Sequence, residues 1–249
     1  VKWAMKKPDG STAKGREVSY DARFTKRGGV WTYSGEAWER YESPAAVVMY
    51  WPGWEELAKG VAQVFPEIRD RVQVGFMLTF PRAQQVKLYS SMRHLQYSIC
   101  LSYTDGLGGW NEPGEPIKQL THKGQTGEGS RTVLAHEFGH ACTFELGPET
   151  SWMPWWVLEG VAELSAEDFA KNSRENNDKA VRRLAAKNEI PPWKDLTYFN
   201  DVSGANYGKV YTLGHHMLGY VSERFGREKR VAWLTAMAKA MSSLVLTSR

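Results

Sequence analysis

The segment His136-Glu137-Phe138-Gly139-His140 combines residue types and a spacing that suit metal-assisted hydrolysis. The two histidines are four residues apart, so on an α-helix their imidazoles share one face and can bind one zinc ion. Glu137 projects about 100° around the helix from His136. We therefore expect its carboxylate to activate a zinc-bound water as a base, without binding the metal itself.

A catalytic zinc site needs more than this H-E-x-x-H motif, which could also be two histidines on a helix face beside a solvated glutamate. Such sites use three protein ligands and leave a fourth position open. After His140, eighteen residues pass before Glu159, which lies in the sequence Leu158-Glu159-Gly160-Val161-Ala162-Glu163. Two histidines and one carboxylate complete a three-ligand set.

The whole string resembles the gluzincin zinc metallopeptidases, which include the M1 and thermolysin-like peptidases. The spacing between His140 and Glu159 resembles that of the M1 aminopeptidases. The L-E-G-x-A-E motif around Glu159 resembles that of peptidase MA-like domains. The resemblance implies that Glu159 is the third zinc ligand. It also implies that Glu163, one helical turn later, orients a ligand histidine; the alternative is an exposed helix carboxylate. The metzincin motif does not fit. It requires a Gly and a third His after the second His, and Thr143 and Leu146 occupy those two positions in this chain.

A tyrosine motif extends the resemblance, which covers about residues 129–226. The stretch from Tyr211 to Gly226 is similar to the Y-x-x-G…R-Y-G segment of peptidase MA-like domains, in which a Tyr points into the site. The resemblance implies that Tyr211 stabilises the negative oxygen of the tetrahedral intermediate. Tyr207, one turn away on the same face, is the alternative donor, and both could instead be core aromatics.

The expected substrate is a peptide or protein. In gluzincins the strand nearest the cleft pairs with extended substrate, and residues 101–120 are the candidate for that edge. M1 aminopeptidases carry a G-x-M-E-N motif there that grips the substrate amino terminus. This chain lacks it, and Asn111-Glu112 is its nearest acidic match. We therefore predict a zinc-dependent endopeptidase.

Two alternatives lie in other functional classes. One is a non-catalytic binding module of the gluzincin fold that recognises glycan or cell-wall peptide through its aromatic residues; the intact Glu137 counts against it. The other is a structural zinc protein, whose closed site would usually use cysteines. The chain has two cysteines, and neither is placed for such a site.

We expect Cys142 to be a buried free thiol, with a bridge to Cys100 as the alternative.

The helices that position these residues are predicted from caps and breakers. The zinc helix should begin at Ser130 as N-cap and end near Leu146, and the Glu159 helix should run from Pro154 to about Lys171. Further helices are predicted at residues 54–65, where Pro66 stops the helix, and at 178–187, 205–225 and 228–241. Strands are predicted at 30–33, 45–51, 72–80, 95–103 and 117–120, with a loop at 104–114.

These elements predict an α+β fold, and the resemblance implies a zincin-like two-lobed metallopeptidase domain. Residues 1–249 would form one catalytic domain, because no Gly- or Ser-rich linker divides the chain. Residues 1–146 would form an N-terminal lobe with a mixed sheet, helices and the zinc helix. Residues 147–249 would form a helical lobe, with zinc at the floor of the cleft between the two.

The composition sets further bounds. Hydrophobic content of 42% and charged content of 24% are those of a folded globular protein. The net charge of +4 is small and we expect it to be scattered, so no nucleic-acid partner is expected. No apolar run approaches the roughly 18 residues of a transmembrane segment. No signal peptide begins the chain, but Val1 is not an initiator Met, which is consistent with a missing upstream segment. An extracytoplasmic or secreted location is favoured.

Overall fold

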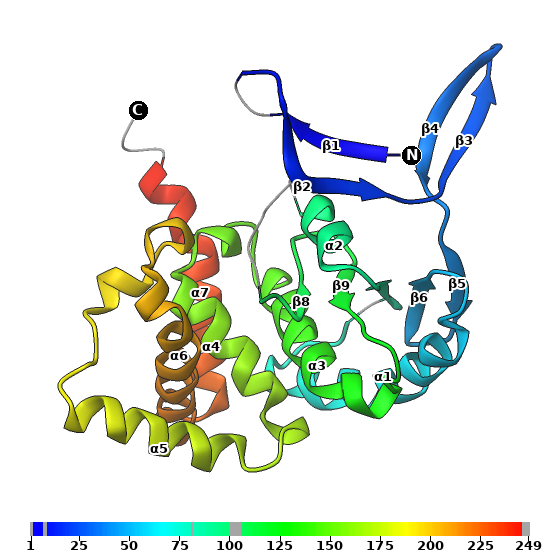
Figure 1. The fold of residues 1–249 in the computed structure, drawn as a ribbon. Coiled ribbons are helices and arrows are strands. Elements are labelled where there is room, and N and C mark those ends of the chain that lie inside the picture. The colour runs from blue at the N-terminus through cyan, green and yellow to red at the C-terminus, as the bar shows by residue number, and fades with distance from the viewer. Residues whose placement is uncertain (1, 7–8, 81, 100–105, 246–249) are drawn as a thin grey trace.

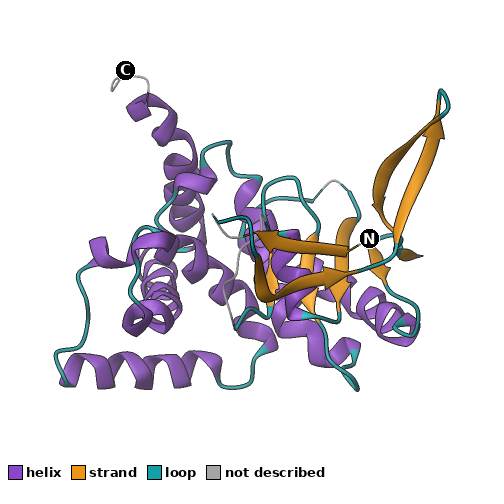
Figure 2. Ribbon diagram, turned by 45° about the horizontal axis from the view of Figure 1, so that its top comes forward, coloured by secondary structure: helices purple, strands orange, loops and turns teal. Residues whose placement is uncertain are grey.

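The structure is a computed structural model that describes residues 2–6, 9–80, 82–99 and 106–245 (Figure 1). Strands dominate the N-terminal half and helices the C-terminal half; Figure 2 shows the orange strands gathered on one side of the molecule, with purple helices on both sides. The α+β class, with a mixed sheet and a helical C-terminal part, is thereby confirmed.

Two antiparallel ribbons precede the main sheet. Strand β1 (Lys2–Lys6) pairs with β2 (Thr12–Ser19), and β3 (Ala22–Arg27) pairs with β4 (Val30–Glu36). Each ribbon forms a two-stranded sheet of its own. The predicted strand at residues 30–33 is confirmed as part of β4.

The main sheet has five strands in the order β5-β6-β7-β9-β8. Their bounds are β5 Glu39–Glu42, β6 Ala46–Tyr50, β7 Gln84–Tyr89, β8 Gly109–Trp110 and β9 Ile117–Leu120. The central strands β6, β7 and β9 are parallel, whereas β5 and β8 pair antiparallel to their neighbours. Strand β8 therefore forms one edge of the sheet, inside the stretch that was predicted to be loop.

Helix α1 (Glu55–Gly75) continues through Pro66, so the prediction that Pro66 stops it is wrong. Pro66 lies on the exposed side, while Ile68 and Val72 extend the buried stripe begun by the preceding turns. Burial of that stripe outweighs the cost of the proline. The predicted strand at 72–80 is wrong for the same reason, because its first residues complete the helix.

Helix α2 (Met92–Ser98) replaces the predicted strand at 95–103, of which residues 100–103 lie outside the described part. Ser91 caps the helix by accepting a hydrogen bond from the backbone nitrogen of His94. Short apolar runs do not distinguish a strand from a buried helix, and here the N-cap decides between them.

Helices α3 (Gly127–Phe144) and α4 (Trp155–Ala166) carry the zinc motif and the Glu159 motif. The N-cap of α3 is Thr126, whose hydroxyl accepts from the Gly129 nitrogen at 3.1 Å, and not Ser130 as predicted. Ser130 is buried in the first turn, where its hydroxyl bonds to the Thr126 carbonyl. Helix α4 ends earlier than Lys171, at a short 3₁₀ turn over Glu167–Phe169.

Three further helices complete the chain: α5 Ser173–Ala186, α6 Gly204–Phe225 and α7 Arg227–Val245. Helix α6 packs closely on α4, because Gly160 and Gly214 meet at the contact. A Cβ on Gly160 would lie only 2.4 Å from the carbonyl carbon of Gly214. Two glycines therefore bring the helix of Glu159 against the helix of Tyr207 and Tyr211.

One continuous cluster of buried hydrophobic residues joins the two halves. It includes Val48 and Phe65 from the sheet side, Phe138 from α3, and Leu218 and Leu234 from α6 and α7. Among the described residues, no helix is both long enough and apolar enough to span a membrane.

Candidate metal centre

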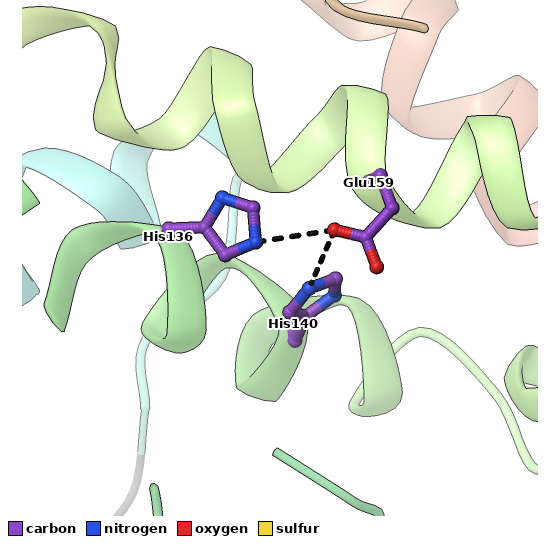
Figure 3. Close-up of side chains that lie close together, drawn as sticks. All are labelled: His136, His140 and Glu159. Carbon is purple, nitrogen blue, oxygen red and sulfur yellow. Dashed lines mark ion pairs between the residues drawn. The ribbon is translucent and has the colours of Figure 1, made fainter. Parts of the chain in front are cut away.

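Three predicted ligand residues meet where α3 crosses α4 (Figure 3). One ligand atom from each of His136, His140 and Glu159 lies within 4.8 Å of the others. The Oε2 atom of Glu159 is 3.2 Å from Nε2 of His136 and 3.4 Å from Nε2 of His140. Helical spacing brings the two imidazoles to one side of α3, with ring centroids 4.9 Å apart.

The carboxylate of Glu159 is held by a neighbour on its own helix. The indole Nε1 of Trp155 donates a 2.7 Å hydrogen bond to Oε1 of Glu159. This bond leaves Oε2 directed at the two imidazoles. Sequence reasoning missed Trp155, although a donor four residues before Glu159 on a helix was the available signal.

The donor set fits a zinc ion. The Oε2 atom of Glu159 is buried and has no hydrogen-bond partner among the described residues, although two histidine nitrogens lie near it. Buried polar atoms without a partner need an explanation, and a cation that accepts lone pairs from all three residues supplies one. Two ligand atoms that lie tetrahedrally on one zinc are about 3.4 Å apart. The observed separations of 3.2 and 3.4 Å agree with that value.

Glu163 contacts the other nitrogen of His136, with Oε1 3.1 Å from Nδ1. A proton on Nδ1 leaves the Nε2 lone pair facing Glu159 and the metal position. Burial alone would lower the pKa of His136, but the Glu159 and Glu163 carboxylates outweigh it and raise that pKa well above its usual value. Burial likewise opposes ionisation of Glu159, yet the two histidines hold its pKa far below the ordinary range.

Glu137 is buried beside the metal position without belonging to the ligand trio. Its Oε2 atom has no hydrogen-bond partner within the described part of the chain, and burial raises the pKa of its carboxyl group. Strand β8 passes close to it: a Cβ on Gly109 would lie 2.5 Å from Oε1 of Glu137. The Asn111 amide donates to the Glu137 backbone carbonyl at 3.2 Å. Sequence reasoning did not identify Gly109 as part of the site.

Two adjoining cavities open onto these residues. The first, of about 170 Å³, is lined by Leu107, Gly109, Trp110, Asn111, His136, Glu137, His140, Phe144, Trp155, Leu158, Glu159, Phe199, Tyr207 and Tyr211. The second, of about 280 Å³, shares six of them: Leu107, Gly109, His136, Glu137, Tyr207 and Tyr211. His136 and Glu137 therefore border both cavities.

Both candidate tyrosines line both cavities. The ring of Tyr211 stacks on that of His136, with the ring centroids 6.2 Å apart. The ring centroids of Tyr207 and Trp155 are 4.8 Å apart. Burial raises the pKa of each phenol, and the Glu159 charge raises that of Tyr211 further, so both hydroxyls stay protonated at neutral pH. Contact between the two hydroxyls further raises the pKa of Tyr211 and partly offsets the effect of burial on the pKa of Tyr207.

Three further ionisable residues, Glu112, His215 and His216, lie away from the centre. Glu112 forms a 3.2 Å ion pair with Lys118 and lines a separate cavity. His215 pairs with Glu167 and His216 pairs with Asp178, each at 2.9 Å, as expected of histidines that pack helices together.

Cys142 is buried in the hydrophobic core, and burial raises the pKa of its thiol. Cys100 and residues 101–105 lie outside the described residues. The alternative disulfide and the first part of the predicted substrate edge therefore have no structural description.

The chain matches no protein-family model, and no curated protein matches it. Among solved structures, it is similar to a two-domain M1 zinc metallopeptidase, a glutamate-to-alanine mutant bound to L-arginine. The two chains are 16% identical, and their superposition has a TM-score of 0.48. The match covers 89% of this chain and 52% of the other, so this chain spans about half the length of that protein.

Proposed function

We propose that the chain is a gluzincin-type zinc peptidase that cuts peptide bonds within a chain. The observation that carries the proposal is the convergence of His136, His140 and Glu159 from two helices within 4.8 Å. The buried Glu137 carboxylate faces the same cavity. Residues 1–146 and 147–249 then act as the sheet lobe and the helical lobe of one catalytic domain.

The three ligands would hold zinc, which supplies a Lewis acid that polarises a carbonyl and lowers the pKa of a water. Glu137 accepts the proton of the attacking water and delivers it to the leaving amine. Its unpartnered Oε2 atom is free for that transfer. Glu163 keeps His136 in the tautomer that presents Nε2 to the metal.

Tyr211 is the proposed donor to the negative oxygen that develops during attack. Its ring lies against His136, and its protonated hydroxyl lines the cavity. A donor in such a buried site needs little reorganisation when charge develops. Tyr207 remains the alternative, because it lines the same cavities.

An internal cut is favoured by the shape and charge of the site. Strand β8 lies at the edge of the sheet beside Glu137, where extended substrate backbone can pair with it. Two adjoining cavities share His136 and Glu137 in their lining, which leaves more space than a single terminal residue needs. In the described part of their lining, the carboxylates are Glu137, Glu159 and Glu163, and each has another proposed role. No described carboxylate is left to bind a substrate ammonium group.

The test is digestion of a diverse peptide library by the purified protein, with and without a chelator. We expect cleavage that chelation abolishes and zinc restores, with one zinc bound per chain. His140→Ala should lose both zinc and cleavage, whereas His122→Ala, at an exposed histidine, should keep both.

Comparing a peptide with its acetylated twin then tests where the cut falls. Equal internal cleavage of both supports an endopeptidase, and stepwise loss from the free peptide alone would overturn that assignment. Bound zinc without any cleavage would instead favour the binding module. Full zinc content in His140→Ala would refute the proposed ligands.

A further inference from the structure

The β3–β4 hairpin extends away from the rest of the protein in both views (Figures 1 and 2). Its strands pair only with each other, and the turn between them is Gly28-Gly29. Every residue from Arg23 to Ser34 is exposed. The hairpin therefore presents its side chains to the surroundings and contributes little to the core.

Large apolar groups cover this exposed element. The exposed fractions are 49% for Phe24, 66% for Val30, 64% for Trp31 and 45% for Tyr33. The register pairs Phe24 with Tyr33 on one face, while Val30 pairs with Arg27 on the opposite face. Apolar side chains thus occur on both faces and at the tip, which is unusual for a segment left in water.

Positive charge lies among these apolar groups. Lys26 lies opposite Trp31, and Arg27 is at the tip. Neither forms an ion pair with another described residue. The expectation that the basic excess is scattered along the chain is wrong. Residues 1–34 contain eight Lys and Arg against three Asp and Glu, a net charge of +5, whereas residues 35–249 carry −1. Three of the eight cations, Arg23, Lys26 and Arg27, belong to the hairpin, which has no acidic residue between Ala22 and Ser34.

We propose that the β3–β4 hairpin is a membrane-contact element that inserts Trp31 and Val30 into the interface of an anionic bilayer. Tryptophan and tyrosine prefer the interfacial layer, where both an apolar ring and a polar group are accommodated. Lys26 and Arg27 then reach the anionic headgroups with their charged ends. The unpaired backbone groups along the hairpin edges keep the insertion shallow.

The geometry disfavours the other anionic or apolar partners. A flat platform for sugars or bases needs open ring faces. Phe24 and Tyr33 instead meet edge to face at 72°, and Lys26 lies 5.8 Å from the centre of the Trp31 ring. A protein partner would normally cover one face, but both faces here carry apolar groups. A second copy of the hairpin would bring like charges together.

Vesicle co-sedimentation tests the proposal, with phosphatidylcholine vesicles that either contain or lack phosphatidylglycerol. The protein should bind the anionic vesicles at low salt at least tenfold more tightly than the neutral ones. Trp31→Ser should weaken that binding about tenfold. Trp152→Ser should not, although Trp152 is similarly exposed at 62%.

A second pair of variants tests the charge. Lys26→Gln with Arg27→Gln should reduce binding to anionic vesicles about tenfold at low salt. Arg182→Gln with Lys187→Gln removes two exposed cations from α5 and its end, and should have no such effect. All four positions on the hairpin and α5 are exposed, so circular dichroism and zinc content should be unchanged and report a folded chain.

Quenching by brominated lipid tests insertion itself. The bromines should quench part of the tryptophan emission, and Trp31→Phe should remove that quenching while it retains most of the binding. Absence of vesicle binding at low salt would overturn the proposal, as would equal effects of the Trp31 and Trp152 changes. Binding to heparin or duplex DNA without vesicle binding would assign the hairpin to a soluble polyanion and overturn it as well.

Discussion

The metal centre between α3 and α4 and the β3–β4 hairpin both combine charged and aromatic side chains, but they hold them differently. In the metal centre, Trp155 fixes Glu159 and Glu163 fixes His136, and these contacts are buried or partly buried. On the hairpin, Lys26 and Trp31 contact each other in solvent. Buried polar groups must find partners, so burial itself orients them, whereas exposed contacts contribute little.

The difference implies that the two regions respond to different kinds of change. Small changes at the metal centre should alter metal binding or rate without altering surface behaviour. Changes on the hairpin should do the reverse, because distant sites that share no partners act independently.

Glu137→Gln should have the largest effect. The change keeps the size of the side chain and removes the base, so we expect activity about a thousandfold lower, or about 4 kcal/mol of barrier. Peptidase kinetics and metal analysis provide the measurement, and zinc content should stay normal. Glu128→Gln, at an exposed glutamate of the same helix, is the control. If Glu137→Gln retained most of its activity, another base would have to act.

Tyr211→Phe should lower kcat about a hundredfold with little change in KM, because it removes only the hydroxyl that stabilises the intermediate. Tyr207→Phe should leave both constants nearly unchanged. Steady-state kinetics of the two variants compare them directly. The reverse outcome would exchange their roles, and two silent variants would remove tyrosine from the mechanism.

Glu163→Gln should weaken zinc binding about tenfold, because it weakens the contact that sets the tautomer of His136. Competition with a fluorescent chelator measures the affinity. Glu175→Gln changes an exposed glutamate of α5 and should leave the affinity unchanged. Equal affinities for all three proteins would show that Glu163 does not support the metal centre.

Substitution of Glu36, at the base of the hairpin, should have the smallest effect of these variants. It should change the stability of the fold and leave zinc binding and activity unchanged. Its carboxylate contacts Nε2 of His94 at 2.6 Å and accepts a hydrogen bond from the Trp38 indole. Burial opposes its ionisation, but His94, Lys87 and Trp38 together lower its pKa. Glu36→Gln should therefore cost about 1 kcal/mol of unfolding free energy near neutral pH.

The pH dependence follows from the sign of that shift. Because the folded pKa of Glu36 is lowered, its contribution is present above the unfolded pKa of about 4.3 and is lost as pH falls through the folded value. Urea unfolding at neutral and acidic pH should thus show the parent and Glu36→Gln converging in acid. A difference that stays constant with pH would contradict this account.

Helices and strands whose signals lie within a few residues were predicted correctly, whereas those that depend on packing with distant residues were not. Strand β9 and helices α3, α4 and α6 lie close to their predicted positions, because periodicity, caps and Pro or Gly signals act within a few residues. Pro66 and the segments at 72–80 and 95–103 were misassigned. There, burial of Ile68 and Val72 in α1 and the Ser91 cap of α2 outweighed the local preference.

The candidate site shows the same division. The sequence alone placed His136, Glu137 and His140 on one helix and pointed to Glu159 and Glu163 on the next, since helical spacing determines which side chains share a face. Tertiary structure decided that Trp155 orients Glu159 and that Gly109 brings a sheet edge beside Glu137. It also decided that Lys26 and Arg27 lie beside exposed aromatic side chains on a hairpin. Local spacing specifies the faces of each element, but which faces meet, and which remain in solvent, depends on packing between residues far apart in the chain.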